Sequence, residues 1–214
     1  VTIWPATELF GNRIDVPGDI SSSVYFAAAG LILPNSEVLI KNVGINPTRA
    51  GLIKVCEAMG ADLTLLNEDH ENAEPTADLL VRTSSLRGCV IEGDIIPTLI
   101  DELPTIAMMA CFAEGTTVIR DAAELKVKES NRIAIMVENL RAMGADVEET
   151  EDGMIIHGGK PLHGAVVDSH KDHRIAMTFA VAALAADGET EIIDADCVDI
   201  SYPAFYEELK KLTK

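Results

Sequence analysis

One seven-residue pattern occurs twice, first as Cys56-Glu57-Ala58-Met59-Gly60-Ala61-Asp62 and again as Leu140-Arg141-Ala142-Met143-Gly144-Ala145-Asp146. In both copies an amphipathic helical pattern runs into a glycine, the residue that most often closes a helix. A strand pattern follows each glycine, at Leu63-Thr64-Leu65-Leu66 and from Val147 onward. The chain therefore contains an internal repeat.

A second pattern occurs three times and extends this repeat. An apolar, Ala-rich helix leads through a polar turn into a strand, and the three strands align on Ile40, Ile119 and Ile193, at offsets of 79 and 74 residues. The helices are apolar on nearly every face, which is typical of buried helices. They lie around residues 24–33, 103–113 and 173–185.

These patterns predict one α/β domain with threefold pseudo-symmetry, in which the apolar helices are buried together and small sheets lie outside. The expected units span residues 14–90, 91–164 and 165–214, and the last ends in a helix from about Pro203 to Leu212. A Rossmann-like parallel sheet is the competing fold, but no strand here is followed by GxGxxG.

Composition excludes several classes of protein. The 214 residues are 48% apolar, enough for a core. A net charge of −18 without a basic tract argues against nucleic-acid binding. The sequence contains no run of about 18 apolar residues, so it predicts no membrane-spanning helix.

The four cysteines indicate the redox compartment of the chain, and the first residue bears on whether a longer protein contains it. Without CxxC spacing, the cysteines favour neither a zinc site nor a disulfide scaffold, and they suit a reducing cytoplasm. Cys56 and Cys111 are expected to be small buried apolar residues. No signal peptide precedes Val1, which is not an initiator methionine, so we expect the chain to be trimmed from a longer protein.

An acidic residue stands at the start of each apolar helix. For Asp19 and Asp172 the simplest interpretation is N-capping, in which the carboxylate accepts unpaired helix N–H groups. Asp101 is less needed for this, because Glu102 and Pro104 offer a capping arrangement of their own.

Two cationic segments are candidates for anion binding. Lys128 and Arg132 are spaced one helical turn apart, with Glu129 beside them, and His173-Arg174 opens the third apolar helix. A solvated i,i+4 charge pattern is the alternative interpretation. If the helix starts meet at one end of the domain, these cations converge with Asp101 to form a site for a phosphate or carboxylate.

No metal or hydrolase motif is present. His157, His163 and His170 show no HxH or HExxH spacing and are expected in loops or at the surface, so we predict no metal site. No GxSxG or Ser/His/Asp arrangement indicates a covalent hydrolase. The residues alone thus predict an anion-binding α/β domain with candidate acid–base carboxylates.

The chain resembles the 5-enolpyruvylshikimate-3-phosphate synthases over nearly its whole length. The motifs that carry the resemblance occur in the same order in that family: Pro17-Gly18-Asp19-Ile20-Ser21-Ser22, Asp101-Glu102-Leu103-Pro104, Lys128-Glu129-Ser130-Asn131-Arg132, Asp172-His173-Arg174-Ile175-Ala176-Met177 and Ser201-Tyr202-Pro203. The resemblance implies an inverse αβ-barrel-like fold of two hinged domains, each of three βαβαββ units. It implies that this chain is the C-terminal domain and that the N-terminal domain is absent.

The resemblance also implies a reaction and residue roles. The 5-hydroxyl of shikimate 3-phosphate adds to C2 of phosphoenolpyruvate and phosphate leaves, without a cofactor. Asp101 would be the general base near the hydroxyl, Lys128 would position that hydroxyl and stabilise charge, and Glu129 would handle the methylene proton. The phosphoenolpyruvate carboxylate would be held by Arg132 and Arg174, with His173 beside it.

One position departs from the family pattern, and two alternatives stay open. Ile200 stands where many members place a lysine three residues after the position of Cys197. The missing half implies an unpaired strand edge and a chain that is inactive alone. The alternatives are a non-catalytic ligand-binding or scaffold domain, and a relative of UDP-N-acetylglucosamine enolpyruvyl transferases, which share Asp101 but lack the Lys-Glu-Ser-Asn-Arg and Asp-His-Arg patterns.

Overall fold

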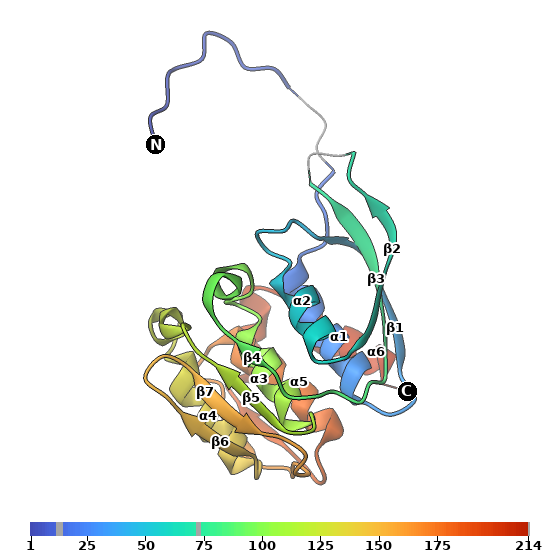
Figure 1. The fold of residues 1–214 in the computed structure, drawn as a ribbon, viewed down its shortest axis with the longest axis vertical. Helices are drawn as coiled ribbons and strands as arrows, with labels where there is room; N and C mark the ends of the chain where they lie inside the picture. The colour runs from blue at the N-terminus through green and yellow to red at the C-terminus, as the bar shows by residue number, and fades with distance from the viewer. Residues whose placement is uncertain (12–14, 72–73, 214) are drawn as a thin grey trace.

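The structure is a computed structural model that describes residues 1–11, 15–71 and 74–213. Residues 1–11 form no helix or strand and extend away from the rest of the chain (Figure 1). Large apolar side chains of this segment are exposed, among them Ile3, Trp4, Leu9 and Phe10. No helix of the described part is long and apolar enough to cross a bilayer.

The helices and strands follow one another in three sets. The first set is α1 (Ile20–Ile32), β1 (Glu37–Gly44), α2 (Gly51–Ala58), β2 (Asp62–Asp69) and β3 (Thr76–Arg82). The second is β4 (Val90–Ile91), η1 (Gly93–Thr98), α3 (Leu103–Cys111), β5 (Thr116–Ile119), η2 (Ala123–Val127), α4 (Arg132–Ala142), β6 (Asp146–Glu149) and β7 (Met154–His157). The third is β8 (Val166–Asp168), α5 (His173–Ala185), β9 (Glu191–Ile193), η3 (Ala195–Ile200) and α6 (Phe205–Leu212).

Each set contains the same parallel crossover through an apolar helix. Strand β4 pairs in parallel with β5 across α3, and β8 pairs in parallel with β9 across α5. In the first set Gly18 makes a single parallel bridge to Val43 of β1 across α1. The sheets have the orders β1-β3-β2, β4-β5-β7-β6 and β8-β9. The competing single parallel sheet is therefore wrong, and we keep residues 14–90, 91–164 and 165–214 as the proposed limits of the units.

The apolar helices form the interior. Helices α1, α3 and α5 contact one another, and every residue of α3 is buried. Figure 1 shows the β1-β3-β2 sheet on one side of these helices and the β4-β5-β7-β6 sheet on the other. Inside, the hydroxyls of Thr105 and Thr178 share a hydrogen bond of 2.9 Å between α3 and α5. A helix without a polar face is stable only where other side chains shield it from water, as they do in this interior.

Several local predictions are confirmed. Gly60 and Gly144 close α2 and α4 with φ angles of +73° and +89°, a conformation that glycine adopts without strain. Cys56 and Cys111 are buried and free. The terminal helix lies within the predicted range. His163 and His170 are exposed, as expected, and His157 at the end of strand β7 keeps 43% of its side chain exposed, with Nδ1 2.9 Å from the hydroxyl of Thr116.

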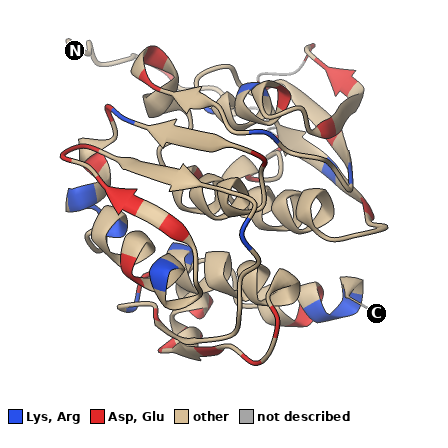
Figure 2. Cartoon of the chain, turned by 60° about the horizontal axis from the view of Figure 1, so that its bottom comes forward, with Lys and Arg blue, Asp and Glu red and all other residues tan. Residues whose placement is uncertain are grey.

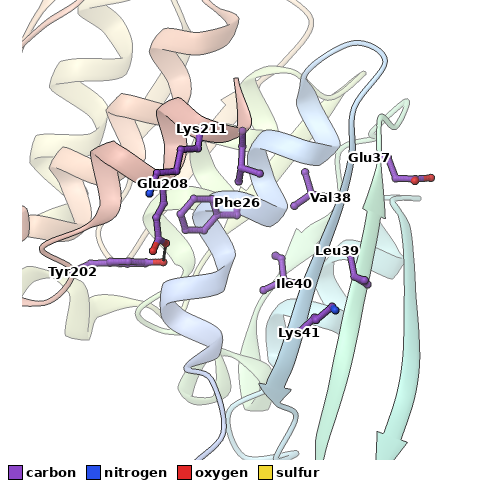
Figure 3. A pocket seen from close by; sticks show the side chains of 10 residues that line it. Phe26, Glu37, Val38, Leu39, Ile40, Lys41, Tyr202, Glu208 and Lys211 are labelled. Carbon is purple, nitrogen blue, oxygen red and sulfur yellow. Dashed lines mark hydrogen bonds between the residues drawn. The ribbon is translucent and has the colours of Figure 1, made fainter. Parts of the chain in front are cut away.

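Strand β1 forms one edge of its sheet, beside an apolar groove. Among the strands of the described residues it pairs only with β3, and Gly18 adds the single bridge to Val43. On its other side a groove lies between β1 and α6, lined by Phe26, Val38, Ile40 and Tyr202 among others (Figure 3). Charged side chains also line the groove, but none of the predicted site residues does, so the candidate site is elsewhere.

Candidate active site

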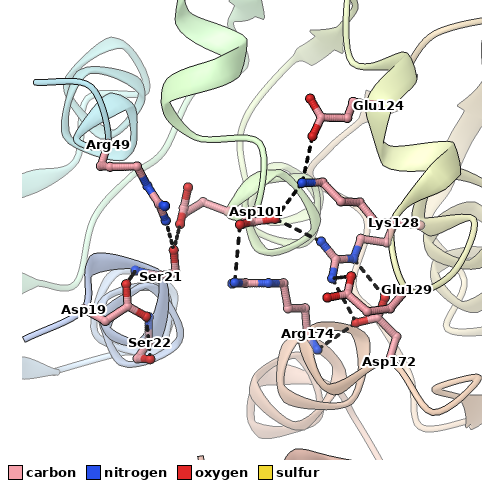
Figure 4. Close-up of polar contacts among 12 residues, drawn as sticks. Asp19, Ser21, Ser22, Arg49, Asp101, Glu124, Lys128, Glu129, Asp172 and Arg174 are labelled. Atoms are coloured by element: carbon pink, nitrogen blue, oxygen red, sulfur yellow. Dashed lines mark hydrogen bonds and ion pairs between the residues drawn. The ribbon is translucent and has the colours of Figure 1, made fainter. Parts of the chain in front are cut away.

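The N-termini of α1, α3 and α5 lie close together, and they differ in how they are capped (Figure 4). Asp19 caps α1 by accepting the N–H groups of Ser21 and Ser22, and Asp172 caps α5 by accepting the N–H of Arg174 at 3.0 Å. Both predicted caps are confirmed. Glu102 occupies the N-cap position of α3 without a capping side-chain bond. Asp101 precedes it, and its carboxylate is left to make other contacts.

Asp101 contacts three cations from different parts of the chain. Its carboxylate lies 3.2 Å from Nη1 of Arg132, 3.4 Å from Nη2 of Arg174 and 3.5 Å from Nζ of Lys128. Glu129 and Asp172 join this group through Arg132. We call these six residues, Asp101, Lys128, Glu129, Arg132, Asp172 and Arg174, the Asp101 cluster. The convergence predicted from the helix starts is thus present.

The path of the chain into α4 differs from the prediction. Lys128 and Arg132 do not share a helix face, because η2 ends at Val127, Lys128 is extended, and α4 begins at Arg132 with Asn131 as its cap. Lys128 pairs with Glu124 at 2.8 Å instead. Lys128 and Arg132 meet through Asp101 rather than along a helix.

Arg132 is the buried centre of the cluster. Its side chain is 0% exposed; Nε donates to Asp172 Oδ2 at 2.8 Å and Nη2 donates to Glu129. Asp172 is equally buried and also accepts from the hydroxyl of Ser130 at 2.8 Å. Arg132 therefore lies behind Asp101 and Glu129, whereas the side chains of Lys128 and Arg174 keep 23% and 17% of their surface exposed.

The ion pairs decide the protonation of these groups. Burial acts to raise the pKa of Asp101, but the charges of Arg174, Lys128 and Arg132 outweigh it and hold this pKa below the usual range. Burial also opposes ionisation of Asp172, yet the hydrogen bond and charge of Arg132 lower its pKa. The hydrogen bond to Glu124 raises the pKa of Lys128. At neutral pH Asp101 and Asp172 are therefore ionised and Lys128 is protonated.

His173 begins α5 at the side of the cluster and is half-buried. Burial, followed by the charge of Arg174, lowers its pKa, so the imidazole is neutral at neutral pH. A neutral imidazole donates or accepts a hydrogen bond but brings no charge to an anion. Among the described residues, no group of three or more His, Cys, Asp or Glu side chains is arranged to hold a metal ion.

Three polar residues beside the cluster were not identified from the sequence as candidates. The hydroxyl of Ser21 donates to Glu102, and Nη2 of Arg49 donates to that hydroxyl at 2.8 Å (Figure 4). Glu102 carried a faint signal as the neighbour of Asp101. Arg49 carried none, because its contact depends on how the loop before α2 lies beside α1.

Charge is distributed unevenly over the chain. Asp and Glu residues occur on strands and loops throughout, while Lys and Arg are fewer (Figure 2). For the binding of an anion, a local group of cations therefore matters more than the net charge of −18. Ile200, where many family members place a lysine, is 78% exposed at the end of η3.

The fold is that of the enolpyruvyl transferases. The enolpyruvyl transferase NikO from Streptomyces tendae superposes with a TM-score of 0.71 over 90% of this chain and 42% of its own, at 22% identity. An EPSP synthase from Acinetobacter baumannii superposes with a TM-score of 0.92 over 96% of this chain and 48% of its own, at 43% identity. The threefold α/β fold class predicted from the sequence is confirmed.

The sequence narrows the class to one family. Residues 1–209 match the family described as EPSP synthase (3-phosphoshikimate 1-carboxyvinyltransferase). Proteins named 3-phosphoshikimate 1-carboxyvinyltransferase are 55% identical in Thermoanaerobacter pseudethanolicus and 54% identical in Geobacillus kaustophilus, each over 99% of this chain and 50% of the relative. The chain belongs to the EPSP synthase family. It spans about half the length of these relatives.

Proposed function

We propose that this chain is the part of a 3-phosphoshikimate 1-carboxyvinyltransferase that carries the Asp101 cluster, acting in the shikimate pathway to chorismate. In this reaction the 5-hydroxyl oxygen of shikimate 3-phosphate bonds to C2 of phosphoenolpyruvate while the methylene carbon gains a proton. Loss of that proton and departure of phosphate then give the enolpyruvyl ether. The observation that carries the proposal is the convergence of Asp101, Lys128 and Arg174 at adjoining helix starts in a member of this family.

Asp101 is the proposed general base near the 5-hydroxyl. In the free site its carboxylate is the shared counter-ion of three cations, which keeps it ionised but weakly basic. An incoming phosphate or carboxylate competes for those cations. As they turn to the substrate, the pKa of Asp101 rises and the carboxylate becomes a better proton acceptor.

Lys128 and Glu129 are proposed to serve the addition step. Lys128 has three donors and contacts Asp101, so it positions the 5-hydroxyl and stabilises the charge that develops there. Glu129 keeps 53% of its side chain exposed, so it is accessible to deliver a proton to the methylene carbon and to take one back. A positioned acid–base group of this kind contributes roughly 10²–10⁴-fold to the rate.

Arg174, Arg132 and His173 are proposed to bind the carboxylate of phosphoenolpyruvate. A guanidinium group matches a carboxylate with two parallel hydrogen bonds. Arg174 is partly exposed and is the first to be reached. Arg132 becomes available only when Glu129 or Asp101 turns away from it, and His173 adds a hydrogen bond without charge.

The other half of the enzyme is the proposed partner. Relatives are twice as long, and a site between two domains works only when they close on the substrates. We therefore expect negligible turnover by this chain alone. The four free cysteines suit the reducing cytoplasm that we propose as the location.

The test is an assay of phosphate release from shikimate 3-phosphate plus phosphoenolpyruvate. The chain is assayed alone, mixed with the N-terminal half of the Thermoanaerobacter pseudethanolicus relative, and fused to that half. We expect release only where both halves are present. Turnover by the chain alone, or by the fusion with UDP-N-acetylglucosamine as the acceptor in place of shikimate 3-phosphate, would contradict the proposal.

Two variants test the roles in the active fusion. Asp101→Ala and Glu129→Gln are each expected to lower kcat by roughly 10²–10⁴-fold. Glu92→Gln is the control, because Glu92 pairs with Arg120 on the surface at 2.8 Å and lies outside the Asp101 cluster. Unchanged kcat in either test variant would remove that residue from the proposed chemistry. A folded but inactive fusion would support the non-catalytic alternative.

A further inference from the structure

Arg49 is an exposed cation placed beside the candidate site. It precedes α2, and Nη2 donates to the hydroxyl of Ser21 at 2.8 Å. Within residues 1–11, 15–71 and 74–213, no carboxylate lies within ion-pair distance of its guanidinium. Among the other described arginines, Arg82, Arg120, Arg132 and Arg174 each pair with a carboxylate, whereas Arg87 and Arg141 also lack an ion pair but lie away from the cluster.

Arg49 is held by a buried support. The hydroxyl of Ser21 accepts from Arg49 and donates to Glu102, so both of its hydrogen-bonding roles are fixed. Ser21 and Glu102 are 2% and 1% exposed. A guanidinium has five N–H donors, and four remain to bind a ligand. The long side chain is thus oriented before a ligand arrives.

Glu102 does not fully cancel the charge of Arg49. Burial raises the pKa of Glu102, which favours its neutral form. Its second oxygen, Oε2, is buried and meets no hydrogen-bond donor among the described residues. An ionised carboxylate in that position would be poorly solvated.

Carboxylates already neutralise the positive charges of the Asp101 cluster. Its three cations, Lys128, Arg132 and Arg174, are engaged by four carboxylates, those of Asp101, Glu124, Glu129 and Asp172. A phosphate group carries up to two negative charges and needs cations that are not already neutralised. Arg49 is such a cation. It is linked through Ser21 to Glu102, the neighbour of Asp101 in the chain.

We propose that Arg49 is a further anion-binding residue of this site, that it binds the phosphate group of a phosphorylated substrate, and that Ser21 and Glu102 are positioning residues for its guanidinium. The identity of the substrate rests on the proposed function. The phosphate contact itself rests on the geometry around Arg49.

The binding test uses the chain as it is. Calorimetric titration with inorganic phosphate, shikimate 3-phosphate and phosphoenolpyruvate compares wild type with Arg49→Gln, Arg49→Lys and the control Arg120→Gln. Arg49→Gln is expected to weaken binding of at least one phosphorylated probe about tenfold, as loss of one charged hydrogen bond does. Arg49→Lys restores part of it, and Arg120→Gln changes nothing. The probe that is affected identifies the source of the phosphate.

Positioning is tested in the fusion with the relative's N-terminal half. Ser21→Ala and Glu102→Gln are expected to raise the KM of the same phosphorylated substrate several-fold and to leave kcat nearly unchanged. A general loss of structure would lower both kcat and the melting temperature. An equal fall in kcat and kcat/KM would therefore overturn the positioning role.

Three results would overturn the anion-binding role. They are unchanged affinity in Arg49→Gln, an equal loss in Arg120→Gln, and no binding of any of the three probes by the wild-type chain. These outcomes are separate from failure of the proposed function, which is decided by turnover of the wild-type fusion. An active fusion with an unchanged KM in Arg49→Gln would contradict this inference and leave the function standing.

Discussion

At the scale of single residues, Arg132 organises the charged cluster. Its guanidinium, fully buried, contacts Asp101, Glu129 and Asp172, which come from the start of α3, the loop before α4 and the start of α5. Burying such charges is costly, and removing one partner is costlier still because the others stay buried and unpaired. Arg132 is therefore a determinant of stability as well as a proposed ligand of the substrate.

Replacing Arg132 with Met is expected to lower the free energy of unfolding by about 3–5 kcal/mol, because Asp172 loses its buried counter-ion. The measurement is urea unfolding at neutral pH. The matched control is Arg120→Met, which breaks a surface pair with Glu92 and is expected to change stability by less than about 1 kcal/mol. Similar losses of unfolding free energy in both variants would show that the buried ion pairs contribute no more stability than a surface pair.

Asp172 gives the cluster a predicted dependence on pH. Because the pKa of Asp172 is lowered in the folded state, its stabilising contribution is present above the ordinary value of about 3.9 and is lost as pH falls through the folded-state pKa. Asp172→Asn should be less stable than wild type at pH 7, and the difference should shrink below about pH 4. Urea unfolding across this range measures it. A difference that stays constant with pH would contradict the ion-pair explanation, and Asp62→Asn on the surface of β2 is the control.

At the scale of elements, α1, α3 and α5 supply both the core and the site. Because they are apolar on all sides, they pack against one another and not against water. Each is entered by a parallel crossover strand or bridge, so their N-termini face the same end of the domain. That shared direction brings together residues that are up to about 155 positions apart, from Asp19 to Arg174.

The Thr105–Thr178 bond between α3 and α5 tests this packing. Thr105→Val is expected to cost about 1–3 kcal/mol, because the buried hydroxyl of Thr178 loses its partner. The double variant Thr105→Val with Thr178→Val should cost less than the sum of the two single changes, since no polar group is then left unpaired. Urea unfolding of the four proteins gives the coupling, and strict additivity would show that the hydroxyls do not interact.

At the scale of the whole molecule, two apolar surfaces lie outside the core. One is the segment 1–11, whose side chains are all exposed, and the other is the groove beside the edge strand β1. The segment contributes nothing to the packed interior of the described residues, whereas the groove is lined in part by core side chains such as Phe26. The folded body is therefore expected to keep its stability without the segment.

Deleting residues 1–11 is expected to change the free energy of unfolding by less than about 0.5 kcal/mol, since it removes no buried contact. The control is Phe205→Ala in α6, which removes a fully buried ring and is expected to lower the free energy of unfolding by about 3–5 kcal/mol. Thermal and urea unfolding compare the two. A large loss on deletion would mean that the segment packs on the body in solution.

The repeat, the buried helices, their caps and the closing glycines could all be predicted from the sequence, because they depend on local periodicity and on residues near one another in the chain. The sequence also picked out Asp101, Lys128, Glu129, Arg132 and Arg174. The burial of Arg132 behind Asp101, the position of Lys128 outside α4 and the contact of Arg49 with Ser21, which itself donates to Glu102, appear only in the folded chain. Those contacts join distant segments, and their geometry follows from how the helices pack, which no local pattern encodes.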